Sequence, residues 1–207
     1  LHAAEKCQMP SGVFSHVYGA SFEVGKALVM HPRTAAVGFT GSYVGGRQLF
    51  DWANQRKHPI PVFAEMGSVN PVFLLPERLK KQTTPLAEQI TGSVTLGVGQ
   101  FCTNPGLIFG IEGEVLQQFI HDLGRAIQKT VPAPMLHPGI VRAYKEKKGA
   151  ALLQEDVHLV AESETAVGPD QGLPTIATTT GNAFLKNPLL HQEIFGPYSL
   201  VVRCKDM

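Results

Sequence analysis

A cysteine lies in the glycine-rich stretch GVGQFCTNPG at residues 97–106. A cysteine attacks carbonyl carbon as its thiolate, which backbone N–H groups or a nearby cation favour. Gly97 and Gly99 permit unusual backbone geometry and the close approach of a substrate, and the N–H groups around Cys102 can contribute to an oxyanion site. A buried structural cysteine is the commoner alternative. The surrounding polar residues and proline make a poor core strand, so we treat Cys102 as a candidate nucleophile.

A second reactive group is the carboxylate of Glu65, which follows an apolar run and precedes Met66 and Gly67. We expect Glu65 to lie at the end of a buried strand and its carboxylate to be partly desolvated. Desolvation raises the pKa of a carboxyl group and suits it to activate water as a general base. The alternative is a capping or salt-bridging carboxylate, which is the ordinary role of an isolated Glu.

Two further segments can bind the parts of a ligand. The sequence GFTGS at residues 38–42 is expected between a strand and a helix, where free N–H groups at the helix N-terminus favour phosphate. A plain turn capped by Ser42 is the alternative, and the segment is not the GxGxxG fingerprint. The sequence EIFGP at residues 193–197 places Glu193 and Phe195 before a Gly-Pro turn, where they can hold a ribose hydroxyl and a ring. A turn at the edge of a strand with a packed Phe is the alternative.

Composition limits the class of protein. The 207 residues are 43% hydrophobic and 17% charged, with a formal net charge of +1, so we expect a folded chain that binds neither nucleic acid nor a membrane. No apolar run approaches the length of a membrane span. The widely spaced Cys7, Cys102 and Cys204 and the absence of a recognisable secretion signal favour the cytoplasm. Neither a CxxC pair nor a His/Cys cluster is present, so no metal site is predicted.

Helical and strand-like segments alternate along the chain, which predicts an α/β fold with mostly parallel sheets flanked by helices. Helices are expected at residues 1–9, 21–30, 42–55, 85–96, 114–129 and 141–153, the last with a basic patch at 145–148 that we interpret as a solvated face. Strands are expected at residues 13–18, 35–39, 61–65, 70–75, 107–111, 157–161, 175–179 and 199–203. The stretch EMGSVNP at residues 65–71 interrupts two apolar strands and suggests a domain boundary near Gly67.

Taken together and in this order, the motifs resemble those of the aldehyde dehydrogenase superfamily. FTGS (39–42) resembles its cofactor-side turn, EMGSVNP (65–71) its ELGGKSP segment, GQFCTNPG (99–106) its nucleophile loop, and the segment 174–202 the region that ends in EEIFGP. Each motif alone is moderately specific, and the ordered set is strongly so. The GVGQFCTNPG variant looks most like the branch that oxidises α-ketoglutaric semialdehyde (2,5-dioxovalerate).

The resemblance implies a role for each candidate. Cys102 would attack an aldehyde to give a thiohemiacetal, hydride would pass to NAD or NADP, and water activated by Glu65 would hydrolyse the thioester to the acid. Gly41 and Ser42 would lie by the cofactor pyrophosphate, while Glu193 would bind the nicotinamide ribose and Phe195 would flank the nicotinamide.

The resemblance also implies a domain organisation. Residues 1–66 would be the C-terminal part of an NAD(P)-binding domain, and residues 67–207 most of a catalytic domain. The family is about twice this length, so the chain resembles a central fragment that is expected to be inactive alone, and the full-length enzyme would be a homo-oligomer. Val69 replaces the usual Lys and Ser68 a usual Gly, which suggests a divergent branch.

Two other functions remain open from the sequence. Cys102 can instead serve a thiol hydrolase or acyltransferase with a histidine partner, although no paired motif places a histidine beside it. The chain can also be a catalytically dead structural remnant that binds a partner.

Overall fold

The computed structural model describes residues 2–19 and 21–206, which divide into two compact units. The first unit ends at Gly67 and the second begins at Ser68. The first unit contains α1 (His2–Lys6), α2 (Phe22–Met30), β1 (Val37–Gly41), α3 (Tyr43–Gln55) and β2 (Val62–Met66). The second contains β3 (Val72–Leu74), α4 (Pro76–Thr95), η1 (Leu96–Gly99), β4 (Leu107–Ile111), α5 (Glu114–Gln128), β5 (Ala133–Pro134), α6 (Pro138–Leu152), β6 (His158–Glu162), β7 (Gln171–Gly172), β8 (Thr175–Thr180), α7 (Gly181–Lys186), η2 (Pro188–His191) and β9 (Tyr198–Cys204).

The first unit is built on a parallel pair of strands, β1 and β2, in which Thr40 lies opposite Glu65. Helix α3 begins directly after β1, where the Ser42 side chain accepts a hydrogen bond from the Gly45 N–H. Close packing on the sheet explains the glycine at position 46, because a Cβ there would lie 2.4 Å from the Met66 side chain. This strand–turn–helix arrangement is the one expected for the GFTGS sequence.

Residues 13–18 do not form the predicted strand. The segment follows Gly12 in the left-handed region, with φ of +85°, and its apolar side chains are exposed, Tyr18 by 89%. A strand is stable only when it pairs and buries one face, so apolar composition alone was misleading here. Helix α1 ends at Lys6, earlier than the proline at position 10 would require.

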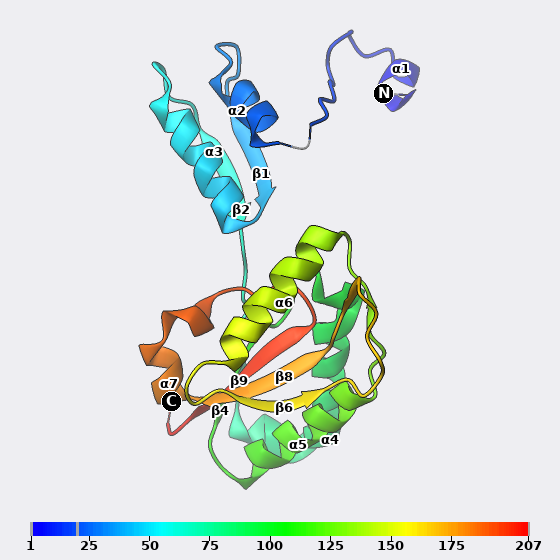
Figure 1. Ribbon diagram of the computed structural model, residues 1–207, viewed down its shortest axis with the longest axis vertical. Helices are drawn as coiled ribbons and strands as arrows, with labels where there is room; N and C mark the ends of the chain where they lie inside the picture. Colours follow the sequence, from blue (N-terminus) through cyan, green and yellow to red (C-terminus); the bar gives the residue numbers. More distant parts are fainter. Residues whose placement is uncertain (1, 20, 207) are drawn as a thin grey trace. The chain divides into compact units, whose positions relative to one another are not determined.

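The second unit contains a five-stranded sheet with the order β3-β4-β9-β8-β6 (Figure 1). The first four strands of that order run parallel, and β6 is antiparallel to β8. The apolar runs around residues 107–111 and 199–203 form the two strands β4 and β9 near the centre, as expected for strands that are buried on both faces. The predicted α/β class with a mostly parallel sheet is confirmed.

Helices cover both faces of this sheet and form a three-layer unit (Figure 1). On β9, Val201 packs in the cluster that contains residues of α4 and α5, whereas Leu200 and Val202 pack in the cluster that contains residues of α6. This alternation follows from the two-residue period of a strand. The α5 face is strongly apolar, and Phe119 and Leu123 on it are fully buried.

Helix α4 begins nine residues before the predicted start at Pro85. The helix opens with Pro76 in its first turn, a position where the missing N–H costs nothing. Gln82 inside it has non-helical angles of φ −151° and ψ 51°, three residues before Pro85, where the proline ring disfavours a regular helix. The prediction therefore recovered only the part after the kink. It also missed α7 and the two 3₁₀ turns.

Candidate active site

Cys102 lies in the turn between η1 and β4, and its side chain is exposed. The loop of residues 97–106, called here the cysteine loop, is held from the segment before β3. The Asn70 amide donates hydrogen bonds to the carbonyl of Cys102 (2.5 Å) and to that of Asn104 (3.1 Å). The expected setting, an accessible thiol outside any core strand, is therefore the one observed.

The start of the cysteine loop has an unusual backbone. Gly97, Val98 and Gly99 have φ values of +53°, +59° and +66°. A β-branched residue such as valine rarely adopts this left-handed region, and strain of this kind is commonly found where a site must be held in one geometry. Gly99 has no alternative, because a Cβ there would lie 2.3 Å from the carbonyl carbon of Gly196.

The segment of residues 193–197, called here the EIFGP segment, packs directly against the cysteine loop. The Asn104 amide donates to the Gly196 carbonyl over 3.0 Å. Glu193 is half-buried, and one of its carboxylate oxygens accepts a hydrogen bond from the Ser68 N–H (3.1 Å). The structure thus brings together the two segments that carry Cys102, Glu193 and Phe195, although they are about 90 residues apart in the chain.

A small cavity lies where these segments meet. Its volume of about 20 Å³ is close to that of a single water site. Glu193 and Phe195 line it together with Ser68, Phe101 and Asn104. Residues of both the cysteine loop and the EIFGP segment therefore form the walls of this cavity.

Gly41, Ser42 and Glu65 lie in the first unit. Ser42 caps α3 as the structural interpretation predicted, and it is exposed together with Gly41. Glu65 is opposite Thr40 near the carboxyl ends of two parallel strands, the edge of such a sheet at which ligands are commonly bound. These three residues therefore share one end of the β1–β2 pair.

The prediction that Glu65 is partly desolvated is wrong for the first unit taken by itself. The side chain is exposed, because β1 and β2 form a two-stranded sheet in the described residues. Glu65 and Cys102 belong to different units.

Sequence reasoning missed two residues that shape the site. Asn70 holds the cysteine loop, and Asn104 joins it to the EIFGP segment. Asn70 has φ of +39°, a conformation that asparagine tolerates better than most residues. A polar amide placed just before the Pro-Val-Phe strand was the signal that could have indicated its role.

Two histidines of the second unit form hydrogen bonds with backbone groups outside the cysteine loop. His137 accepts hydrogen bonds from the N–H groups of Gly139 and Ile140 and so caps α6, and His191 is bonded to the Phe184 carbonyl. Among residues 2–19 and 21–206, no group of three or more His, Cys, Asp or Glu side chains is arranged to hold a metal ion. In the same part of the chain, no helix combines the length and apolar character needed to span a membrane.

Comparison with known proteins adds independent information. The family model described as "Aldehyde dehydrogenase family" matches residues 1–207. An α-ketoglutaric semialdehyde dehydrogenase 2 of Azospirillum brasilense is 43% identical over 99% of this chain and 39% of its own length. A second α-ketoglutaric semialdehyde dehydrogenase, from Acinetobacter baylyi, is 39% identical over 96% of this chain and 38% of its own length. The chain thus spans about two fifths of these relatives.

Solved structures with the same fold include an NAD-dependent benzaldehyde dehydrogenase from Corynebacterium glutamicum. It superposes with a TM-score of 0.81 at 22% identity, covering 98% of this chain and 44% of that one. The aldehyde dehydrogenase KauB from Pseudomonas aeruginosa also gives 0.81 at 22% identity, with 98% and 42% covered. At this identity the likeness establishes the fold.

Proposed function

The chain belongs to the aldehyde dehydrogenase family, and from this premise we propose that it carries the nucleophile of an NAD(P)-dependent oxidation of an aldehyde to a carboxylic acid. The observation that carries the proposal is the exposed Cys102 in a loop packed on the segment that bears Glu193 and Phe195. A nucleophile must lie beside the group that accepts the hydride, and these two segments supply that pairing within one unit.

The residues present fit the cofactor. The exposed Gly41 and Ser42 precede the N-terminus of the 13-residue helix α3, whose first N–H groups lack intrahelical partners and suit a pyrophosphate. Glu193 has one carboxylate oxygen fixed by the Ser68 N–H, so its other oxygen would be available to accept a hydrogen bond from a ribose hydroxyl, and Phe195 would flank the nicotinamide ring. When bound, NAD(P)⁺ supplies the acceptor for a hydride.

The chemistry on the protein begins at Cys102. Its thiolate adds to the aldehyde carbon and forms a C–S bond, and the carbonyl oxygen becomes an oxyanion that the N–H of Cys102 can bind. Loss of hydride from that carbon leaves a thioester on the sulfur. Water that has given a proton to Glu65 then attacks the thioester, which releases the acid and regenerates the thiolate. Glu65 is exposed, so its carboxylate can reach water.

We assign the first unit to the end of the cofactor domain and the second to the catalytic domain, of which Gly67 and Ser68 mark the junction. The substrate we propose is α-ketoglutaric semialdehyde, because relatives of that name are 43% and 39% identical to this chain. The enzyme would act as a homo-oligomer in the cytoplasm, where the three free cysteines are kept reduced. Because the chain spans about two fifths of those relatives, we expect the 207-residue chain alone to be nearly inactive.

The reactivity of the three cysteines tests the proposal. We expect iodoacetamide to modify Cys102 faster than Cys7 or Cys204 in the folded chain, as measured by mass spectrometry of the three peptides. Cys7 is the control for simple exposure, since it is exposed as well. Equal rates at Cys7 and Cys102 would favour the structural remnant. The expectation of inactivity has its own test: NAD(P)H formation by the isolated chain, abolished by Cys102→Ala, would contradict it.

A further inference from the structure

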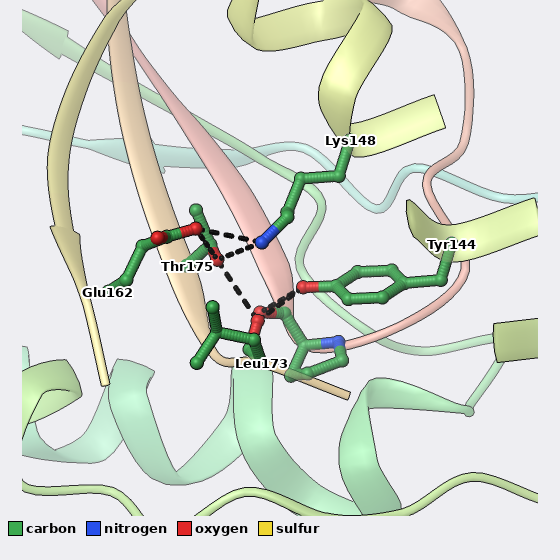
Figure 2. Close-up of polar contacts among 6 residues, drawn as sticks. Tyr144, Lys148, Glu162, Leu173 and Thr175 are labelled. Atoms are coloured by element: carbon green, nitrogen blue, oxygen red, sulfur yellow. Dashed lines mark hydrogen bonds and ion pairs between the residues drawn. The ribbon is translucent and has the colours of Figure 1, made fainter. Parts of the chain in front are cut away.

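Tyr144 is a buried tyrosine on α6 that contacts the end of the EIFGP segment and the short connection between β7 and β8. Only 1% of its surface is exposed. Its hydroxyl donates to the Leu173 carbonyl (2.6 Å) and also lies 3.3 Å from the Pro197 carbonyl oxygen (Figure 2). Burial raises the pKa of this hydroxyl, so it keeps its proton and remains a donor at any physiological pH.

A partly buried ion pair holds α6 in the position from which Tyr144 reaches that turn. Lys148, one helical turn after Tyr144, was expected on a solvated face, but its side chain is only 12% exposed. Its ammonium group lies 2.7 Å from a Glu162 carboxylate oxygen on β6 and 3.1 Å from the Thr175 hydroxyl on β8 (Figure 2). It also lies 5.7 Å from the centre of the Tyr144 ring, within reach of a cation–π attraction.

The ring of Tyr144 packs on the backbone of Gly196. A Cβ at Gly196 would lie 2.3 Å from a ring carbon of Tyr144, and a Cβ at Gly99 would lie 2.3 Å from the Gly196 carbonyl carbon. Gly196 is therefore in contact with the Tyr144 ring and with the cysteine loop, to which its carbonyl is also joined by the Asn104 amide. A second lysine of α6, Lys147, donates to the Glu193 carbonyl at the other end of the segment (3.0 Å).

We infer that Tyr144, held by the Lys148–Glu162–Thr175 cluster, is a positioning residue that fixes the EIFGP segment and, through Gly196, the cysteine loop. Glu193 and Phe195 precede Gly196 in one short segment, and Gly99 lies three residues from Cys102. A displacement of the Gly196–Pro197 peptide therefore alters the spacing between the residues of both segments. The consequence of this positioning for catalysis rests on the function proposed above. The positioning of the two segments by Tyr144 does not depend on that function.

The test compares Tyr144→Phe with Tyr198→Phe in the 207-residue chain. Both changes remove one hydroxyl from a buried tyrosine of the second unit, but the Tyr198 hydroxyl has no hydrogen-bond partner among the described residues. We expect hydrogen exchange at residues 97–106 and 193–198 to accelerate at least threefold in Tyr144→Phe and to be unchanged in Tyr198→Phe. Exchange in β4 and α5 serves as the reference for the rest of the unit.

The alkylation rate of Cys102 is the readout that a merely structural role would not change. Reactivity of the thiol depends on the backbone N–H groups that we expect around it, and a looser loop would no longer hold them in place. We therefore expect iodoacetamide modification of Cys102 to slow at least threefold in Tyr144→Phe. Cys204, on β9 of the same unit, is expected to keep its rate. Lys148→Met, which removes the ion pair from the other side of the cluster, is expected to reproduce both local effects.

The inference is overturned if Tyr144→Phe leaves both segments and Cys102 unchanged. It is also overturned if exchange rises equally across β4 and α5, or if Cys102 and Cys204 change together, because the hydroxyl would then serve only the general stability of the unit. Failure of the proposed function gives a different result: Cys102 would react no faster than Cys7 in the unsubstituted chain, whatever the effect of Tyr144→Phe.

Discussion

Asparagine side chains organise the candidate site at the scale of single residues. Asn70 binds two carbonyls of the cysteine loop, and Asn104 binds the Gly196 carbonyl of the neighbouring segment. An amide carries two donor hydrogens, so one side chain can satisfy two carbonyls and fix their separation. The position of the Cys102 backbone therefore depends on residues that perform no chemistry.

Replacing Asn70 with alanine tests this dependence. Asn70→Ala removes the donor of the Cys102 carbonyl and one of the two donors of the Asn104 carbonyl, which keeps the Gly106 N–H. It also places alanine in a backbone conformation that asparagine tolerates better. We expect the free energy of unfolding of the second unit to fall by about 1–2 kcal/mol, as measured by urea denaturation. Asn182→Ala, at an exposed position of α7, is the control and should change it by less than about 0.5 kcal/mol. Equal effects of the two variants would show that Asn70 does not hold the loop.

At the scale of elements, close backbone packing joins η1 to the turn before β9. Gly99 is buried, has a positive φ and would place a Cβ 2.3 Å from a backbone carbon. Backbone atoms cannot yield as a flexible side chain can, so this glycine is required by the contact between two elements.

Two glycine substitutions should therefore have opposite effects. Gly99→Ala is expected to destabilise the second unit by more than about 1 kcal/mol, because its conformation and its packing both exclude a Cβ. Gly92→Ala, in helix α4 where an added Cβ would meet no neighbouring atom within 4 Å, is expected to stabilise it by about 0.5–1 kcal/mol. Thermal unfolding of both variants measures the difference, and a Gly99→Ala protein as stable as the Gly92→Ala protein would refute the packing argument.

The elements that sequence reasoning predicted well are those whose own residues determine them. The apolar run at residues 107–111 forms β4 with the predicted limits, and the amphipathic stretch from Glu114 forms α5. The first half of α4 is rich in charged and polar residues and carries little apolar periodicity, so it was missed. The strand at 13–18 was predicted from composition alone, and no neighbouring strand pairs with it in the described residues.

The candidate site was predictable to the extent that its motifs are local. The segments around Cys102 and Glu193 were identified from their own residues, and the structure brings those two segments together. The contributions of Asn70 and Tyr144 arise from contacts between positions about 30 to 50 residues apart. Such contacts depend on the order of strands in the sheet, which the sequence pattern does not specify.

At the scale of the whole chain, both large apolar clusters belong to the second unit. That unit also buries two tyrosines, Tyr144 and Tyr198, and burial raises the pKa of both. Unfolding returns these hydroxyls to water, where they ionise near about pH 10. Below that pH the folded and the unfolded chain both keep these protons, so titration of the two tyrosines does not change the stability of the unit. Above it the unfolded chain loses protons that the folded chain retains, so the free energy of unfolding falls as the pH rises.

The alkaline loss of stability should be smaller in Tyr198→Phe. We expect the urea midpoint of the second unit to fall between about pH 8 and about pH 10.5, and to fall less in the variant because one of the two groups no longer titrates. Tyr198 is suited to this comparison because its hydroxyl has no partner in the described part of the chain, so the substitution removes no hydrogen bond. An identical pH dependence in the two proteins would exclude Tyr198 as a contributor.

The addition of an aldehyde to Cys102 is the central chemical claim, and it can be measured without cofactor. An aldehyde that forms a thiohemiacetal occupies the thiol, so preincubation with α-ketoglutaric semialdehyde should slow iodoacetamide modification of Cys102 in proportion to aldehyde concentration. The rates at Cys7 and Cys204 should not change, and α-ketoglutarate, which has a carboxylate in place of the aldehyde, should protect none of the three. Protection of all three cysteines to the same degree, or of none, would contradict the assignment of Cys102 as the nucleophile.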